Sequence, residues 1–473
     1  MDMSQNFIPE SVRRIHLIAV CGSAMGALAC MLKDLGYEVT GSDQKIYPPM
    51  SWFLAERGVR ILDGFRPENM AHRPDLVVVG NAVPRTNPEA AHLEQLKIPF
   101  CSMPQAVNRF VAAGKQTLMV TGTHGKTTAS ALLAWILQTA GRDPSFMIGG
   151  ILKNFDSNYR LGHGRDFVIE GDEYDTAFFD KGPKFLHYHP AATVLTSIEF
   201  DHADIYRDLD HVQSAFRRLV ESLRGESLLV ACDRDANIDA VVAGASPAVQ
   251  RYSSEVGSDW RLGPIQVDPP WTAFEVLREG RSFGRFRTRM IGRHNLLNAL
   301  GVLAVADHLG VSAAAAAEAL ERFEGVKRRQ EIRGERRGVI VMDDFAHHPT
   351  AVRETIAAVR SSFPGRRLFA VFEPRTNSSM RKVFQAVYPS SFDGADITCI
   401  RRPSMLEKIP EGERFSSEEL VQELERRGRA AHFFSGTQEI IDFLVKTAAA
   451  GDMILIMSNG GFDNIHERLL ESL

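Results

Sequence analysis

Residues 121–128 have the sequence Thr121-Gly122-Thr123-His124-Gly125-Lys126-Thr127-Thr128. They follow an apolar run, Thr117 to Val120, and they precede a helical pattern from Ala129 to Gln138. A strand, a glycine turn and a helix start in this order form a phosphate-binding loop, because backbone N–H groups and the helix N-terminus face the anion. In such a loop Lys126 reaches the β- and γ-phosphates and the Thr127 hydroxyl binds Mg²⁺. The stretch therefore predicts an ATP site.

One position departs from the full P-loop pattern, since the residue five before Gly125 is Val120 and not glycine. The alternative interpretation is a glycine-rich turn with a solvent-exposed lysine. Phosphate binding is favoured because Gly-Lys-Thr lies between a strand and a helix. We expect these loop residues to contact the nucleotide: Gly122, Thr123, His124, Gly125, Lys126, Thr127 and Thr128.

Length and composition indicate an ordinary multidomain enzyme. The chain has 473 residues, enough for two to four domains, with 44% hydrophobic and 24% charged residues. A formal net charge of -4 gives no reason to expect nucleic acid or an anionic membrane as a partner. The five cysteines are scattered and form no C-x-x-C pair, which favours a reducing compartment without a disulfide framework or a zinc cage.

A stretch near the N-terminus resembles a targeting segment in one respect. Arg13-Arg14 precedes a largely apolar run to Leu32, as in a signal peptide or a membrane span. Gly22 and Gly26 interrupt this run and divide it into a short strand and an amphipathic helix. We therefore expect a cytoplasmic protein without membrane insertion.

Residues 1–102 have the pattern of a nucleotide-binding α/β unit. A buried strand is predicted from Ile15 to Val20, followed by a glycine turn, Cys21 to Gly26, and a helix from Ala27 to Leu35. Asp43 lies about twenty residues beyond the turn, where dinucleotide-binding folds place an acid on ribose hydroxyls. The turn is not a true G-x-G-x-x-G, so these residues alone leave diphosphate binding and a plain parallel sheet equally open.

In the following unit, acidic residues collect where predicted strands end. One buried strand ends at Glu170, and another leads into Glu199-Phe200-Asp201-His202. Because the carboxyl ends of parallel strands line the ligand site, Glu170 is expected to meet a metal ion beside the phosphate loop. His202 lies between Asp201 and Asp204 and suits a second metal ligand or a general base. The alternatives are a solvated acidic loop and a structural histidine.

Two regions of this unit have weaker patterns. Residues 141–150 are predicted to form a loop region, and residues 245–290 irregular antiparallel strands. Asn295 and Asn298 then open an alanine-rich helix and share one helical face, so both can address one ligand. Two capping amides are the alternative.

A third α/β unit is predicted for residues 323–473, after the basic joint Lys327-Arg328-Arg329. Polar loops follow three of its predicted strands: Asp343 to Pro349, Glu373 to Asn377 and Ser458 to Phe462. Loops at the ends of parallel strands indicate a crevice. Arg375, Asn377 and Asn459 are candidates for binding carboxylates, since a guanidinium fork suits a carboxylate. A salt-bridged or capping loop is the alternative for each of them.

Together these motifs resemble those of the Mur ligases. They are T-G-T-H-G-K-T-T, E-x-D-E, E-x-D-H, H-N-x-x-N, R-R and D-[YF]-x-H-H-P, in this order along almost the whole chain. The family consists of three-domain, ATP-dependent, amide-forming enzymes of bacterial wall synthesis. The resemblance implies an α/β protein with a Rossmann-like UDP-sugar domain (1–102), a P-loop ATPase domain with a mostly parallel sheet (103–322) and a Rossmann-like peptide domain (323–473).

The resemblance also implies roles for individual residues. For ATP it adds Asn295, Asn298, Arg329, Asp344 and His347 to the loop residues. For the UDP-sugar it implies Gly22, Ser23, Met25, Gly26, Ser42, Asp43 and Asn81. For Mg²⁺ it implies Thr127, Glu170 and His202. The catalytic residues implied are Lys126, Glu170, His202 and Arg329.

The substrates follow from the same resemblance: ATP, UDP-N-acetylmuramate and an amine acceptor. The phosphate loop and the His202 motif are similar to family members that add L-alanine in de novo wall synthesis. Other stretches are similar to members that add the tripeptide L-alanyl-γ-D-glutamyl-meso-diaminopimelate in peptidoglycan recycling: 42–50, 80–82, 170–181, 373–377 and 457–462. We predict the tripeptide as acceptor, with L-alanine as the alternative.

Two other classes of protein are weaker interpretations. A P-loop switch would hydrolyse ATP to change partners, but no feature of the sequence suggests a partner surface. A Rossmann oxidoreductase is disfavoured because the first unit lacks the full glycine pattern and the second carries an ATP loop.

Overall fold

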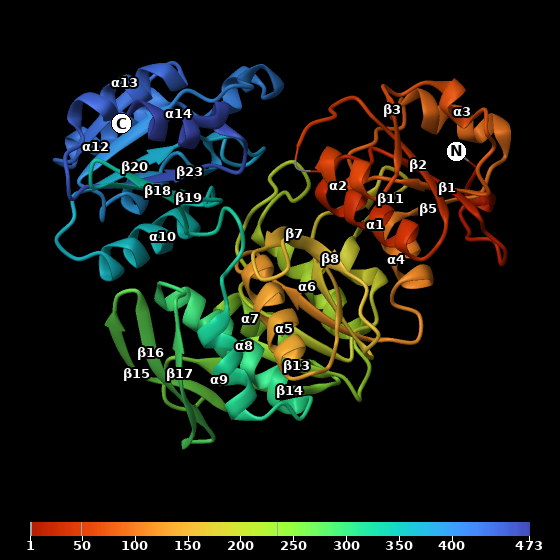
Figure 1. Cartoon of the computed structure of the whole chain (residues 1–473), viewed down its shortest axis with the longest axis horizontal. Coiled ribbons are helices and arrows are strands. Elements are labelled where there is room, and N and C mark those ends of the chain that lie inside the picture. The colour runs from red at the N-terminus through yellow and green to blue at the C-terminus, as the bar shows by residue number, and fades with distance from the viewer. Residues whose placement is uncertain (1, 49, 234) are drawn as a thin grey trace.

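The computed structural model describes residues 2–48, 50–233 and 235–473. Pro49, within the stretch 42–50 quoted above, lies outside the described residues. Three α/β units follow one another along the chain, each built around its own sheet (Figure 1). The sheets have five, ten and six strands, and the predicted α/β fold class is confirmed. Among the described residues, no helix is both long and apolar enough to cross a membrane.

The first sheet is wholly parallel, with the strand order β3-β2-β1-β4-β5. Its strands are β1 (Arg14–Ile18), β2 (Glu38–Asp43), β3 (Arg60–Asp63), β4 (Leu76–Val79) and β5 (Phe100–Ser102). Its helices are α1 (Ser23–Asp34), α2 (Met50–Glu56) and α3 (Pro88–Leu96), and α4 (Met103–Phe110) leads to the next unit. The strand order reverses between β1 and β4, the point at which open parallel sheets bind ligands.

The turn after β1 is shorter than the sequence pattern indicates. The strand ends at Ile18 because Ala19 adopts a left-handed conformation, with φ 66°. Helix α1 begins at Ser23, with Gly22 as its N-cap, and not at Ala27. Three predicted sugar-binding residues, Ser23, Met25 and Gly26, therefore lie in the first turn of a helix.

The central sheet has the order β17-β16-β15-β14-β13-β12-β6-β9-β7-β8. Its strands are β6 (Gln116–Thr121), β7 (Ser145–Leu152), β8 (Ser157–Arg160), β9 (Asp166–Gly171), β12 (Ala192–Leu195), β13 (Leu228–Cys232), β14 (Ala248–Ser253), β15 (Trp260–Asp268), β16 (Trp271–Arg278) and β17 (Arg281–Thr288). The short hairpin β10 (Asp175–Ala177) and β11 (Asp180–Pro183) stands apart. The central helices are α5 (Lys126–Thr139), α6 (Leu209–Ser222), α7 (Ala236–Val242), α8 (Arg293–His308) and α9 (Ala313–Arg322).

Two sequence predictions for this sheet were wrong. Residues 145–150 belong to β7, which pairs in parallel with β9, and are not part of a loop. The glycines of this strand mislead a composition-based prediction, because glycine usually weakens strands. Strand β14 pairs in parallel with β13, so only β15 to β17 form the expected antiparallel part of residues 245–290.

The third sheet has the order β18-β19-β23-β20-β21-β22, with only the edge strand β18 antiparallel. Its strands are β18 (Glu331–Arg336), β19 (Val339–Asp344), β20 (Leu368–Phe372), β21 (Ile397–Arg401), β22 (Ala430–Phe434) and β23 (Met453–Met457). Its helices are α10 (Pro349–Ser362), the short α11 (Tyr388–Ser391), α12 (Ser417–Arg426), α13 (Thr437–Thr447) and α14 (Ile465–Ser472).

The strand that precedes the phosphate loop is buried on both faces. In β6, Leu118 and Val120 belong to the core cluster formed with α5, α8 and α9, whereas Met119 belongs to the cluster on the opposite side. Successive side chains of a strand point to opposite faces, and burial of both is typical of parallel sheets covered by helices. The loop that begins at Thr121 therefore starts from a rigidly packed strand.

We expect Leu132→Ala, on α5, to lower the free energy of unfolding by about 2–5 kcal/mol, because the side chain is wholly buried and its removal leaves a cavity. The control in the same unit is Val256→Ala, where the valine is 86% exposed, which should cost much less. Urea unfolding followed by tryptophan fluorescence suits the comparison, since three of the four tryptophans lie in the central unit. Equal losses for the two variants would contradict this account of the core.

Candidate active site

The phosphate loop joins β6 to α5 and has the conformation of an anion cradle. Gly122 and Gly125 have positive φ values of 127° and 82°, and Gly125 is the N-cap of α5. Both glycines are also required by close packing, because a Cβ on Gly122 would collide with Thr196 and one on Gly125 with Asn298. The Thr196 hydroxyl fixes the loop by donating to the His124 carbonyl at 2.5 Å. The N-terminus of α5 is thereby open to an anion.

Lys126 is charged and largely buried at this helix start. Its Nζ donates to the Gly122 carbonyl at 2.6 Å and to Glu173 Oε2 at 2.7 Å. Burial alone would lower the pKa of Lys126, but the neighbouring carboxylates, Glu173 first among them, outweigh burial and raise it. The lysine is therefore held as an ammonium ion.

Glu173 links Lys126 to His202. Its other oxygen, Oε1, lies 3.2 Å from His202 Nε2. Burial opposes the charge on both partners, yet the two cations lower the pKa of Glu173 to about 2, and the carboxylate raises the pKa of His202 to about 9. Glu173 was not among the predicted site residues. Its place in the E-x-D-E motif, just after a buried strand, was the available signal.

Thr127 and Glu170 meet on the other side of the loop. The Thr127 hydroxyl donates to Glu170 Oε2 at 3.1 Å, and Gly149 N–H donates to Glu170 Oε1 at 2.7 Å. Arg329 Nη2 reaches Thr127 Oγ1 at 3.4 Å from the joint with the third unit. Burial, reinforced by Asp172, raises the pKa of Glu170. The structure thus brings together the four predicted catalytic residues, with Glu170 and His202 both directed to the loop.

The hydroxyl of Thr127 and the carboxylate of Glu170 fit a Mg²⁺ ion, because Mg²⁺ prefers oxygen donors and a cation would compensate the buried carboxylate. His202 fits less well in this structure. Its Nε2 is engaged by Glu173, and the raised pKa means that the ring carries a proton where a metal ligand needs a lone pair. To bind a metal ion through Nε2, His202 would have to give up this ion pair.

Asn295 and Asn298 lie on one face of α8, as predicted, and both are buried. Asn298 Nδ2 lies 3.4 Å from Asn295 Oδ1, and Asn295 Nδ2 donates to Gln330 Oε1 at 2.9 Å. The backbone N–H of Gln330 in turn donates to Asp344 Oδ2 at 2.8 Å. A chain of hydrogen bonds therefore connects the central helix to the first strand pair of the third unit.

One cleft of about 1820 Å³ extends across all three units. Most of the predicted ATP and metal residues line it, including His347 of the third unit. From the first unit it is lined by Gly22, Ser23, Met25, Asp43 and Asn81. Asp43 is fixed there, because its carboxylate accepts the N–H groups of Cys21 at 2.9 Å and Lys45 at 3.0 Å.

Two predicted sugar-binding residues do not reach the cleft. Ser42 is wholly buried and donates to Glu89 Oε2 at 2.5 Å, since it points away from the face on which its neighbour Asp43 lies. Gly26 lies inside α1, where a Cβ would collide with the Met50 side chain. Their positions indicate that they support the turn between β1 and α1 and do not contact a ligand directly.

The three predicted peptide-binding residues also lie outside this cleft. Arg375 packs across Gly460, and its Nη1 lies 3.7 Å from Glu373, a wholly buried carboxylate. Asn377 donates to Asp204 Oδ2 of the central unit at 2.8 Å. Asn459 keeps a buried Oδ1 without a hydrogen-bond partner among the described residues. The structure places them on adjoining loops at the ends of β20 and β23.

Comparison with known proteins agrees with this architecture. Three family models match in order: "Mur ligase family, catalytic domain" at residues 14–115, "Mur ligase middle domain" at 120–306 and "Mur ligase, glutamate ligase domain" at 328–460.

Among similar proteins, the UDP-N-acetylmuramate–L-alanyl-γ-D-glutamyl-meso-2,6-diaminoheptandioate ligase of Escherichia coli is 41% identical, over 97% of this chain and 98% of the relative. The UDP-N-acetylmuramate–L-alanine ligase of Myxococcus xanthus is 33% identical, over 99% and 96%. The crystal structure of a murein peptide ligase from Psychrobacter arcticus superimposes with a TM-score of 0.73 at 34% identity, over 98% of both chains. With a relative this similar over its full length and three models matched in sequence, the chain belongs to the Mur ligase family.

Proposed function

We propose that the chain is an ATP-dependent, ADP-forming ligase that joins L-alanyl-γ-D-glutamyl-meso-diaminopimelate to UDP-N-acetylmuramate. The observation that carries the proposal is the phosphate loop with Glu170 on one side and the Glu173–His202 pair on the other. The higher identity to the tripeptide ligase than to the alanine ligase supports the tripeptide as acceptor. ATP as co-substrate and five scattered cysteines support a cytoplasmic location for this reaction in peptidoglycan recycling.

In this proposal each of the three units binds a different substrate. Residues 1–102 bind the UDP-sugar at the switch point of the first sheet, beside Asp43 and Asn81. Residues 103–322 bind ATP at the phosphate loop, and residues 323–473 supply Arg329, Asp344 and His347 to the nucleotide and carry the peptide site.

The reaction then proceeds in two steps. The lactyl carboxylate of UDP-N-acetylmuramate attacks the γ-phosphorus of ATP, and the bond to ADP breaks, which gives an acyl phosphate. The α-amine of the tripeptide's L-alanine attacks the acyl carbon and loses a proton, and inorganic phosphate leaves.

Two anions meet in the first step, so the site must supply positive charge. Lys126 donates to the transferring phosphate, and Arg329 adds a second cation from the domain joint. Thr127 and Glu170 are the residues that would hold Mg²⁺, which would supply positive charge to the reacting phosphates. Burial of these groups in the cleft strengthens each interaction by excluding water.

Comparing the two amine acceptors decides whether the enzyme uses the tripeptide or L-alanine. With ATP and UDP-N-acetylmuramate present, we expect phosphate release to be rapid with the tripeptide and slow with L-alanine at equal concentration. Release measured continuously by a coupled phosphate assay provides the comparison. A preference for L-alanine would assign the chain to de novo synthesis, and ATP turnover that ignores the UDP-sugar would exclude a ligase.

Replacing Lys126 by alanine should separate chemistry from sugar binding. We expect kcat/KM to fall at least about 100-fold, because a preorganised charge is lost from the reacting phosphate. The affinity for UDP-N-acetylmuramate, measured by calorimetry, should stay nearly unchanged because the sugar site lies in another unit. Lys446→Ala, an exposed lysine on α13, is the matched control. Equal loss of both properties in Lys126→Ala would refute this division of labour.

Removing the Thr127 hydroxyl tests the proposed Mg²⁺ ligands. Thr127→Val keeps the shape of the side chain and should raise the Mg²⁺ concentration for half-maximal activity about tenfold, equivalent to about 1.4 kcal/mol of binding. Thr127→Ser retains the hydroxyl and should keep a Mg²⁺ requirement close to that of the wild type. The same Mg²⁺ dependence in the valine and serine variants would rule out a ligand role for this hydroxyl.

A further inference from the structure

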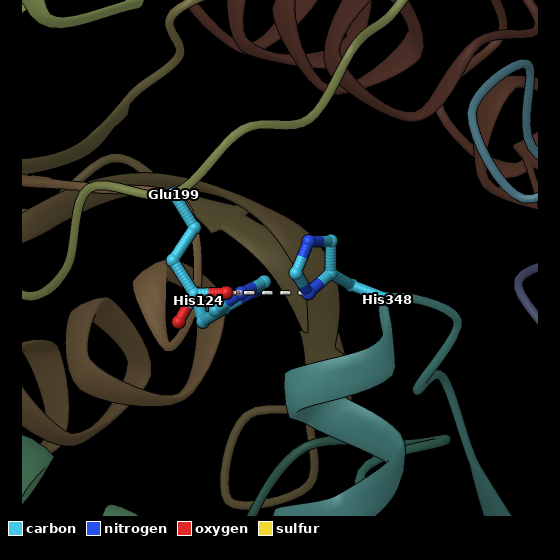
Figure 2. Close-up of side chains that lie close together, drawn as sticks. All are labelled: His124, Glu199 and His348. Atoms are coloured by element: carbon cyan, nitrogen blue, oxygen red, sulfur yellow. Dashed lines mark hydrogen bonds and ion pairs between the residues drawn. The ribbon is translucent and has the colours of Figure 1, made fainter. Parts of the chain in front are cut away.

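A second cluster of metal-binding side chains lies about the same cleft, apart from Thr127 and Glu170. His124 comes from the phosphate loop, Glu199 from the segment after β12, and His348 from the N-cap of α10 (Figure 2). One ligand atom of each residue lies within 4.8 Å of the other two. All three residues line the cleft, so an ion in solution can reach them.

Two distances within the cluster, both from Glu199, match those between the ligands of a tetrahedral metal ion. Glu199 Oε2 lies 3.3 Å from His124 Nε2 and 3.4 Å from His348 Nδ1. Tetrahedral zinc with bonds of about 2.0–2.1 Å places neighbouring ligand atoms about 3.3–3.4 Å apart. Two imidazole nitrogens and one carboxylate oxygen also leave a fourth position for water, as in many zinc sites.

The hydrogen bonds around His348 leave the nitrogen that faces Glu199 unprotonated. Its Nε2 can only donate to the Phe200 carbonyl, at 3.1 Å, because a carbonyl has no proton to give. Its Nδ1 accepts the backbone N–H of Thr350 at 3.2 Å, so it carries no hydrogen, and a bound metal ion would take its single lone pair from this hydrogen bond. A histidine that ligates a metal typically donates its other ring N–H to a carbonyl or carboxylate in this way.

Glu199 is oriented by a second neighbour. The Thr350 hydroxyl donates to Glu199 Oε2 at 2.7 Å. The same carboxylate oxygen thus lies between the unprotonated Nδ1 of His348 and the His124 ring. A cation between Glu199 Oε2 and His348 Nδ1, which are 3.4 Å apart, would be attracted by both atoms.

We propose that His124, Glu199 and His348 form a binding site for a divalent transition-metal cation of the Zn²⁺ type. The donor set separates this site from the proposed Mg²⁺ site, because imidazole nitrogen favours Zn²⁺ whereas Mg²⁺ favours oxygen alone. The ion joins the phosphate loop of the central unit to the start of α10 in the third unit. Its binding does not depend on the proposed ligase reaction.

The test uses the full-length protein, freed of metal and then titrated with Co²⁺ in the presence of millimolar Mg²⁺. Four-coordinate Co²⁺ gives intense visible absorption bands, so we expect such bands to grow to one equivalent and to disappear when Zn²⁺ is added. Because the ion connects two units, Zn²⁺ should also raise the thermal unfolding temperature of the wild type.

Two variants remove one ligand each. His348→Asn keeps a good N-cap residue at the start of α10, and His124→Asn keeps a polar side chain in the loop. Each should weaken Co²⁺ binding at least about tenfold and abolish the thermal shift with Zn²⁺. Thr350→Val keeps all three ligands and removes only the hydroxyl that orients Glu199. It should weaken Co²⁺ binding less than the two ligand variants do, and this graded effect distinguishes loss of a ligand from misfolding.

Two control variants complete the set. His163→Asn, at an exposed loop position, should bind Co²⁺ as the wild type does. His202→Asn should also retain the bands, since His202 belongs to the other cluster. The proposal is overturned if the wild type shows no tetrahedral bands or if both ligand variants retain them. It is also overturned if the bands are lost only in His202→Asn.

Discussion

The carboxylate of Glu173 between Lys126 and His202 is the interaction on which the candidate active site depends. A lysine buried without a partner would lose its charge, and a buried ion pair that loses one member is strongly destabilised. Glu173 prevents this on both sides, at 2.7 Å from Lys126 and 3.2 Å from His202. The loop, the strand end at Glu170 and the segment around His202 are thereby held in one arrangement.

The third unit completes this arrangement by direct contacts with the central one. Arg329 reaches the Thr127 hydroxyl, Ser378 Oγ accepts the Ala203 N–H at 3.1 Å, and Asn377 donates to Asp204. Each contact joins the loop or the His202 segment to a part of the chain beyond residue 322. In the proposed function a nucleotide in the cleft would touch groups from both units, so closure of one unit on the other would assemble the site.

The parts of the site that the sequence predicted are those fixed by local chain geometry. Glycine, lysine and threonine between a strand and a helix specify the phosphate loop without reference to distant residues, and Glu170 follows from the end of a buried strand. Glu173 was missed because an acidic run has the composition of a solvated loop, and its partners are distant in sequence. Ser42 was misplaced because one step along a strand reverses the direction of the side chain. Residues 145–150 of β7 were taken for a loop because glycine carries no β-propensity, although Gly149 supplies the N–H that Glu170 accepts.

In the proposed reaction, Glu173 and the phosphates of ATP compete for the Lys126 ammonium. In this structure it donates to Glu173, and in the proposed reaction it must donate to phosphate instead. If Glu173 had no second cation, movement of the Lys126 ammonium to the nucleotide would leave this buried carboxylate unpaired. His202 supplies that cation, and its raised pKa of about 9 keeps it protonated at neutral pH. The lysine can therefore move to the nucleotide without leaving an uncompensated charge behind, which makes the Glu173–His202 pair a positioning device for the phosphate loop.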